Sequence, residues 1–355
     1  MQIDYLIAGQ GISGTWLSWY LEKENISYLV TDDHDEKAPS RLAAGIINPI
    51  TGRRHVSTWM IEKLLPFAWE AYTRLGEELG ITGISRRNII DFFPNPQMRE
   101  SFLKRVAEKT DYVFAGDDGT SLNDYFHYEF GYGEIRPVYT AHLEAIIPAW
   151  RKKLIQENRL RTEKLHWEEL EIFPDHIRYR DIRARKIIFC DGAAGADNPW
   201  FKLLPFAPNK GQALFLEIPG LPAGNIYKKG LSLVPLLRKD HWWLGSAYEW
   251  DFTHTEPTVE FREKAESALK QWLKIPWKVI NHIASIRPAT IERRPFAGLH
   301  PLYPSLGILN GMGTKGCSLA PWFARELTQH LLHNSPIHPE ADLRRFSRIL
   351  SRDIS

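Results

Sequence analysis

The chain has 355 residues, with 45 Lys plus Arg against 43 Asp plus Glu, a formal net charge of +2 and 43% hydrophobic residues. This composition is typical of a globular protein of about two domains, and it excludes intrinsic disorder. The near-zero charge gives no support for binding nucleic acid or membrane surfaces through bulk electrostatics. Two cysteines, Cys190 and Cys317, are too few for a disulfide framework or a four-cysteine zinc site, and they fit a reducing compartment.

The N-terminal segment from Met1 to Ala8 lacks a basic start, a long apolar stretch and a cleavage site, so we expect no signal peptide. No apolar run approaches the roughly 20 residues that a membrane-spanning helix needs. We therefore expect a cytoplasmic protein without a membrane span.

The first thirty residues predict a βαβ unit. The apolar run Tyr5 to Ala8 is typical of a buried strand, residues 15–23 show helical spacing, and Ile26 to Thr31 predict a second strand. Such a unit is the usual start of a parallel α/β sheet.

The remaining elements predict an interleaved arrangement. Helices are expected over 59–80, with a kink or break at Pro66, over 139–158, over 256–274, and from Pro321 to Leu332. A hairpin over 171–179, a strand over 186–190 and an antiparallel sheet over 211–250 fill the intervals. The α/β layer is thus interrupted, re-entered near 187 and re-entered again near 306, which disfavours two domains in tandem.

A complete G-x-G-x-x-G motif, Gly9-Gln10-Gly11-Ile12-Ser13-Gly14, follows the first strand and opens the first helix. In a dinucleotide site the first glycine permits the tight turn, the second admits the pyrophosphate, and the third lets helix and strand pack closely. The amides of Ile12 and Ser13 would face the phosphates at the positive end of the helix dipole.

Two acidic residues at the end of the second strand, Asp32 and its alternative Asp33, can accept hydrogen bonds from an adenosine ribose. The next loop, Pro39 to Pro49, offers a hydroxyl at Ser40 and a guanidinium at Arg41 to a phosphate. Small residues follow, and they would let backbone lie against a flat ring.

These motifs and their order resemble the D-amino-acid-oxidase-like family of FAD-dependent oxidoreductases, and within it they are most similar to glycine oxidases. The chain is also similar to the flavin-dependent half of the bifunctional enzymes that modify the tRNA wobble uridine. The segments that carry the resemblance are 9–32, 40–49, 186–195, 208–212, 287–288, 295–298 and 311–321. Residues 80–135 contribute almost nothing to it.

The resemblance implies an α/β fold in which a Rossmann-like FAD/NAD(P)-binding domain is interleaved with an antiparallel-sheet α+β substrate domain. The expected limits are 1–80, 138–208 and 288–355 for the FAD-binding domain, and 81–137 and 209–287 for the substrate domain.

The resemblance also implies non-covalent FAD, because the position of Cys317 does not match the attachment cysteine of sarcosine oxidases. Lys315 either adds a positive charge beside the reduced ring or is a surface lysine, and Pro321 is expected near the first turn of the last helix. The expected FAD contacts are Gly9, Gly11, Ile12, Ser13, Gly14, Asp32, Asp33, Ser40, Arg41, Ala44, Gly45, Ile46, Ile47, Glu169 near the adenine, Gly192, and the loop of Gly311, Met312, Gly313, Thr314, Lys315, Gly316, Cys317 and Ser318.

At the substrate end, Arg287 aligns with the arginine that holds the substrate carboxylate in this family. The family's substrate tyrosine is replaced by Ser232, for which Tyr227 or Tyr248 could substitute, and Met312 stands where a histidine is common. The paired arginines Arg53 and Arg54 could meet an anionic substrate or be solvated.

The predicted reaction oxidises the C–N bond of a small amine or amino acid by hydride transfer to flavin N5, with reoxidation by O2 or another acceptor. No protein side chain is expected to act as catalytic acid or base, and no metal ligand set is present in the sequence. The alternatives are oxidation of a 2-hydroxy acid, modification of a tRNA wobble uridine, which the near-neutral charge disfavours, and flavin binding without catalysis.

Overall fold

The computed structural model describes residues 1–52, 54–116 and 122–352, so Arg53 lies outside the described residues. The chain divides into two compact units, one of residues 1–43, 143–209 and 286–355 and one of residues 44–142 and 210–285. We call them the nucleotide unit and the sheet unit. The domain limits given above remain predictions, and residues 44–80 lie in the sheet unit.

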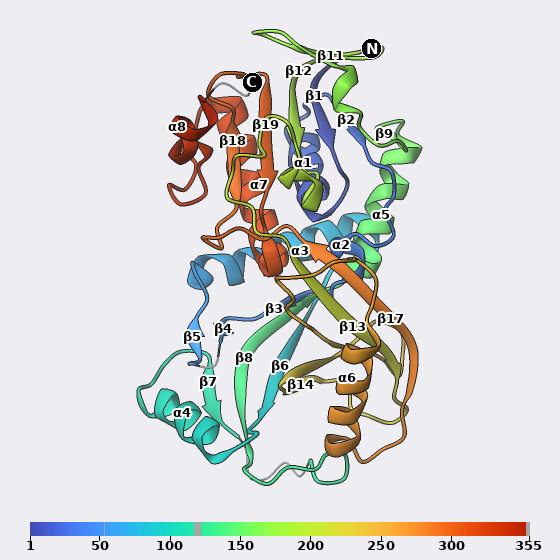
Figure 1. The fold of residues 1–355 in the computed structure, drawn as a ribbon, viewed down its shortest axis with the longest axis vertical. Coiled ribbons are helices and arrows are strands. Elements are labelled where there is room, and N and C mark those ends of the chain that lie inside the picture. Colours follow the sequence, from blue (N-terminus) through green and yellow to red (C-terminus); the bar gives the residue numbers. More distant parts are fainter. Residues whose placement is uncertain (53, 117–121, 353–355) are drawn as a thin grey trace. The chain divides into compact units, whose positions relative to one another are not determined.

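The nucleotide unit contains the predicted βαβ start and an eight-stranded sheet (Figure 1). Strands β19, β12, β1, β2 and β9 form its parallel centre. The strands are β1 (Gln2–Ala8), β2 (Tyr28–Thr31), β9 (Leu160–Arg161), β10 (Leu170–Ile172), β11 (Ile177–Tyr179), β12 (Ile182–Phe189), β18 (Phe296–Leu299) and β19 (Leu306–Asn310). The helices are α1 (Ile12–Lys23), α2 (Pro39–Leu42), α5 (Leu143–Gln156), α7 (Gly316–His333) and α8 (Ser347–Leu350).

The centre of this sheet is buried, as its uninterrupted apolar strands predict. Strand β1 is fully buried from Tyr5 to Ala8, and nine residues of α1 are buried, so this helix is enclosed on nearly all sides. The returns near 187 and 306 are confirmed as β12 and β19, which pair with each other. The chain therefore brings three distant segments to one sheet.

The sheet unit is built on a nine-stranded, mostly antiparallel sheet in the order β17-β13-β16-β15-β14-β6-β8-β3, with β7 on β8. Strands β14 and β6 pair in parallel, whereas β13–β16, β14–β15, β15–β16, β3–β8, β6–β8 and β7–β8 are antiparallel. The strands are β3 (Ile46–Ile47), β6 (Ile84–Phe92), β7 (Val113–Ala115), β8 (Tyr132–Ala141), β13 (Asn209–Glu217), β14 (Asn225–Lys229), β15 (Leu231–Pro235), β16 (His241–Gly245) and β17 (Lys278–Arg287). The hairpin β4 (Ile50–Thr51) with β5 (Val56–Ser57) and the helices α3 (Ile61–Leu79), α4 (Pro96–Ala107) and α6 (Val259–Trp272) complete it.

Local sequence explains several helix limits in the sheet unit. The Asn95 side chain caps α4 by accepting from the Met98 amide, with Pro96 in the first helical position. Thr258 caps α6 in the same way. Helix α3 ends at Gly80, whose φ of +66° is the left-handed conformation that glycine adopts at low cost.

Three helix predictions need correction. The helix predicted over 139–158 begins only at Leu143, because residues up to Ala141 pair in β8 with β3 and β6. Helix α3 runs through Pro66, so the break is absent there, whereas the alternative, a kink, stays a prediction. Helix α7 begins at Gly316, so Pro321 lies in its second turn and not near the first.

Candidate functional site

The glycine turn between β1 and α1 has the close packing that its motif predicts. Gly9 has a φ of +101°, and its amide donates to the carbonyl of Thr31 at 2.8 Å. A Cβ on Gly14 would stand 1.9 Å from the carbonyl oxygen of Gly9. Only glycine at position 14 therefore allows α1 to start directly against the turn.

Helix α2 brings the predicted phosphate contacts to the first turn of α1. The Ile12 amide donates to the Ser40 hydroxyl at 2.9 Å, and a Cβ on Gly11 would lie 3.1 Å from the same oxygen. Arg41 lies 3.6 Å from the Asp32 carboxylate. Amides at a helix N-terminus, a hydroxyl and a guanidinium are together a set of donors suited to phosphate.

Asp32 is the acidic residue that enters this cluster, whereas Asp33 is exposed. The Asp32 carboxylate accepts hydrogen bonds from the amides of Gln10 at 2.7 Å and His34 at 3.0 Å and from the Arg151 guanidinium at 2.6 Å. A carboxylate has about four acceptor sites, so a ribose hydroxyl can still be accommodated. Arg151 is a partner that the sequence reasoning missed, and it is 5% exposed in the middle of α5.

The C-terminal glycine loop, residues 311–318, lies beside this turn. Gly311 and Gly313 have φ values of +76° and +53°, and the Gly313 amide donates to the carbonyl of Pro288. A Cβ on Gly316 would stand 3.3 Å from the Ile12 side chain. Helices α1 and α7 therefore begin next to each other, and the positive ends of two helix dipoles meet at one place.

The side chains of the C-terminal loop differ in exposure. Met312, Cys317 and Ser318 are buried, and Thr314 is exposed. Lys315 is half-buried, and desolvation lowers the pKa of its ammonium to about 8, with a smaller contribution from Arg293. A lysine in such a place is not an ordinary solvated surface group.

A partly buried carboxylate, Asp191, connects this loop to the end of β12. Asp191 accepts hydrogen bonds from the side-chain amides of Asn198 at 3.0 Å and Asn310 at 2.8 Å, and burial raises its pKa to about 6. Asn310 also donates to the carbonyl of Gly192, whose φ is +57°, and accepts from the Gly311 amide. The sequence reasoning predicted a cofactor contact at Gly192 but not this cluster, because Asp191 and Asn310 lie 119 residues apart along the chain.

The predicted contacts at Ala44, Gly45, Ile46 and Ile47 belong to the sheet unit. Gly45 has a φ of +75°, and a Cβ there would stand 1.9 Å from the Ala141 carbonyl oxygen. The next two residues form β3, which pairs with β8. Glycine is thus required at 45 for the chain to lie against β8.

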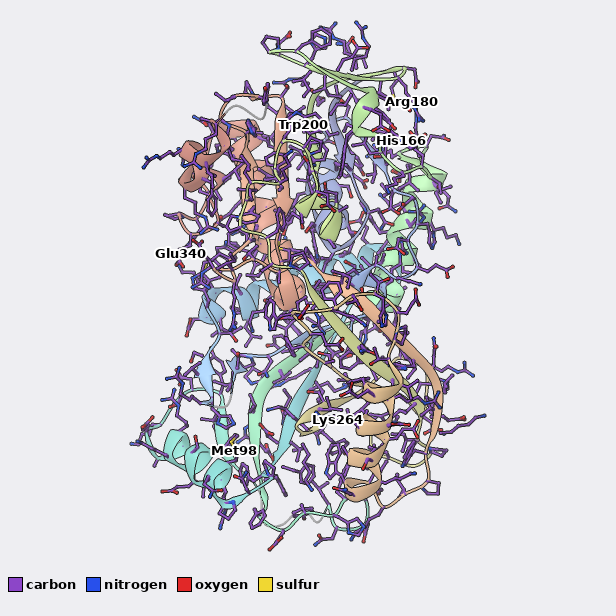
Figure 2. All side chains as sticks on the ribbon, viewed as in Figure 1. Met98, His166, Arg180, Trp200, Lys264 and Glu340 are labelled. Carbon is purple, nitrogen blue, oxygen red and sulfur yellow. The ribbon has the colours of Figure 1, made fainter. Side chains whose placement is uncertain are left out.

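Glu169 is exposed in the turn before β10. Its amide donates to the carbonyl of His166 and its carboxylate pairs with Arg180, and both partners are labelled in Figure 2. Its expected contact with adenine stays a prediction.

Among the substrate candidates, Arg287 ends β17 and donates to the side-chain oxygen of Asn209 at 2.6 Å. Tyr227 is 1% exposed, and its hydroxyl donates to the carbonyl of Pro222 within an aromatic cluster. It therefore offers no accessible surface to a substrate. Tyr248 is 59% exposed, and both tyrosine assignments stay predictions.

The residues of the nucleotide unit fit a dinucleotide. The turn at 9–14, the Ser40 and Arg41 side chains and the C-terminal loop converge on two adjacent helix N-termini, which is the charge pattern that a pyrophosphate and an electron-rich ring require. Within residues 1–52, 54–116 and 122–352, no cluster of His, Cys, Asp or Glu could hold a metal ion, and no helix is long and apolar enough to cross a membrane.

Comparison with known proteins agrees with this geometry. The family model of the DAO FAD-dependent oxidoreductases matches residues 153–330. Glycine oxidase from Bacillus cereus ATCC 14579 is 15% identical over 95% of this chain and 99% of its own, with a TM-score of 0.79. Iminodiacetate oxidase from Chelativorans sp. BNC1 is 19% identical over 97% and 98%, with a TM-score of 0.73.

A third solved structure, FAD-bound L-α-glycerophosphate oxidase from Mycoplasma pneumoniae, is 16% identical over 97% of this chain and 99% of its own, with a TM-score of 0.70. At such identities the solved structures show a shared fold alone. They confirm the predicted fold class, a Rossmann-like parallel sheet combined with an antiparallel-rich second sheet.

Proposed function

Because the chain belongs to the DAO family of FAD-dependent oxidoreductases, we propose that it oxidises the C–N bond of a small amine or amino acid, with FAD held non-covalently. The observation that supports the proposal is the close approach of the C-terminal loop to the dinucleotide turn, where a Cβ added to Gly316 would stand 3.3 Å from the Ile12 side chain. The substrate's α-hydrogen leaves with two electrons and the nitrogen loses a proton. Water then converts the imine to a carbonyl compound and ammonia.

The nucleotide unit supplies the groups that would hold the cofactor. The first amides of α1, Ser40 and Arg41 would bind the pyrophosphate, and Asp32 would bind the ribose. Lys315 and the first turn of α7 would lie at the electron-rich edge of the ring. Bound FAD would accept the two electrons and the hydrogen and return them to O2 or another acceptor.

Arg287 is the group that would fix the substrate. A guanidinium offers paired donors to a carboxylate, and holding the carboxylate orients the α-carbon for hydrogen transfer. Its present bond to Asn209 shows that its head group is already held in one direction. The glycine and iminodiacetate oxidases of the same fold are named for amines that carry carboxylates, which supports this class of substrate.

The first test is the visible spectrum of the purified protein, followed by anaerobic addition of amines, amino acids and 2-hydroxy acids. We expect bound FAD to be bleached by members of the amine classes. Bleaching by 2-hydroxy acids alone would instead assign the alternative oxidation of a C–OH bond. If FAD stayed oxidised after every addition, the proposed oxidation would be refuted and the chain would be a flavin-binding protein without this activity.

The second test replaces Arg287 with Lys, which keeps the charge and removes the paired donors. We expect kcat/KM for an amino acid to fall at least tenfold, because one charge-assisted hydrogen bond contributes about 1.5–3 kcal/mol. Arg238→Lys in an exposed turn is the control. Equal activity of the two variants would remove Arg287 from the substrate site.

A further inference from the structure

The sheet unit contains a pocket that the proposed reaction does not use. Its volume is about 460 Å³, within the range of about 300–1,000 Å³ that is usual for small-molecule sites. Its wall comes from Arg87 of β6, from residues 220, 221 and 223 between β13 and β14, and from residues 235–242 around the turn between β15 and β16. All of these residues belong to the sheet unit, and we call the site the Arg87 pocket.

Arg87 brings an uncompensated cation to this pocket. Its Nη1 donates to the Arg86 carbonyl at 3.1 Å, whereas its buried Nε has no hydrogen-bond partner among the residues that the structure describes. Burial lowers the pKa of the Arg87 guanidinium, and no described carboxylate counters that shift. Buried polar groups nearly always have a partner, because an unpaired one keeps the full cost of its desolvation. The Nε of Arg87 is therefore a candidate donor to a ligand.

The turn between β15 and β16 brings two more cations to the same pocket. Arg238 and Lys239 are exposed in this turn. The backbone around them is held by a hydrogen bond from the Leu236 amide to the His241 carbonyl at 2.9 Å and by another from the His241 amide to the Arg238 carbonyl at 3.1 Å. The two cations are therefore carried by a turn whose backbone is fixed without a ligand.

The charges on the wall favour a multiply charged anion. Apart from His241, the charged side chains that line the pocket are those of Arg87, Arg238, Lys239 and Asp240. Three cations against one carboxylate leave an excess of two positive charges. At neutral pH a phosphate monoester carries about −1.5 to −2 charges on three acceptor oxygens, and a guanidinium offers it paired donors. The pocket therefore fits a phosphate group in both charge and hydrogen bonding.

The rest of the wall is apolar. Leu221 and Trp242 belong to a buried core cluster of the sheet unit, Pro235 is buried, and Leu237 is 47% exposed. An inorganic phosphate ion would contact the cations and leave this apolar part to water. A phosphate monoester with an apolar body would contact the cations and also remove apolar surface from water.

We propose that the Arg87 pocket binds a small phosphate monoester with an apolar body, with its phosphate at Arg87 and Lys239 and its body on the apolar wall. None of the lining residues is among the expected contacts of FAD or of the oxidised substrate. The proposal is therefore independent of the proposed oxidation, and each can be refuted without the other. Loss of one charge-assisted hydrogen bond to the phosphate corresponds to a fall of about 10- to 100-fold in affinity.

The test is isothermal titration calorimetry with phenyl phosphate on the protein in saturating FAD, which keeps the phosphate away from the dinucleotide turn. We expect Arg87→Met, which preserves the length of the side chain and removes its charge, to weaken binding at least tenfold. The matched control is Arg86→Met, because Arg86 is the exposed preceding residue of β6 and does not line the pocket. No binding to the native protein, or equal affinities of the two variants, would overturn the proposal.

Two additions keep the test decisive. Lys239→Met changes an exposed turn residue with little effect on folding, so it tests the site even if Arg87→Met does not fold. We expect it to weaken binding about two- to fivefold, as for an exposed charge pair, and an unchanged affinity would overturn the proposal. Inorganic phosphate and phenol, each representing one half of the ligand, should both bind more weakly than phenyl phosphate. Phenol that bound as tightly would overturn the role of the cations, and inorganic phosphate that bound as tightly would overturn the role of the apolar wall.

Discussion

Replacement of Gly14 by Ala offers a sharp test of the nucleotide site. The added Cβ would stand 1.9 Å from the carbonyl oxygen of Gly9, whereas ordinary contacts begin at 3.4 Å. The turn and the helix would have to separate by about 1.5 Å, the difference between these distances. Neither the turn nor the helix can move easily, because the Gly9 amide donates a hydrogen bond to the Thr31 carbonyl and α1 is buried.

Two opposing effects determine how far Gly14→Ala changes the free energy of unfolding. Alanine in a helix is favoured over glycine by about 1 kcal/mol. Overpacking of a rigid contact costs about 1–3 kcal/mol and occasionally more, and a contact between two backbone segments belongs at the upper end. We expect a net loss of about 2 kcal/mol in the free energy of unfolding. FAD affinity should fall more than about 30-fold, because the displaced amides would no longer converge on the phosphates.

The assay measures FAD affinity by fluorescence titration of the apoprotein, and stability by urea unfolding. Gly11→Ala is an intermediate case, because its Cβ would meet the movable Ser40 side chain at 3.1 Å. Gly224→Ala is the neutral control, since no atom lies within 4 Å of the added carbon. If Gly14→Ala bound FAD as tightly as Gly224→Ala, the turn could not be the phosphate site.

Three further predictions concern titratable groups that are wholly or partly buried. Asp191→Asn leaves a single side-chain oxygen where two amides now donate, so we expect a loss of about 1–3 kcal/mol in unfolding free energy and faster FAD release. Lys315 loses its proton near pH 8, so the flavin midpoint potential should fall more steeply above that pH, and Lys315→Met should abolish the break. Burial lowers the pKa of His142 to about 4. Its contribution to stability is therefore present above pH 6.5 and is lost as the pH falls toward 4. In urea unfolding we expect the free energy of unfolding to be about 1 kcal/mol lower at pH 5 than at pH 7 because of this group, and His142→Gln should not show that loss.

The sequence predicted those parts of the fold that local pattern determines. The apolar run before Gly9 and the helical spacing after it are self-sufficient indications of β1 and α1. The limits that failed depend on distant partners. Residues Tyr139 to Ala141 have a helical pattern, yet they form the end of strand β8. Their hydrogen bonds with β3 and β6 favour the strand over the helix.

The site shows the same division. The glycine motif predicted the turn at 9–14, because each of its glycines is required by the local backbone geometry. Arg151 and Asp191 were not predicted as site residues, because the sequence shows only an arginine in a helical stretch and an aspartate after a strand. Their roles depend on contacts with distant residues, Arg151 with Asp32 and Asp191 with Asn310. The burial of Tyr227 could not be predicted from the sequence either, because it depends on the aromatic residues that pack around it.

The order in which the chain supplies the strands of the nucleotide unit has a consequence for biosynthesis. Strand β1 pairs with β12, and β12 pairs with β19, which ends at Asn310, so each of these pairings forms only after the later strand has been synthesised. At ribosomal speeds of about 5–20 residues per second, the first strand is made roughly 15–60 s before the last one. During that interval the growing sheet exposes an unpaired apolar edge, which is where nascent chains associate wrongly. A C-terminal truncation before residue 306 would remove β19 and make that exposure permanent, so such a shortened chain should depend more strongly on chaperones.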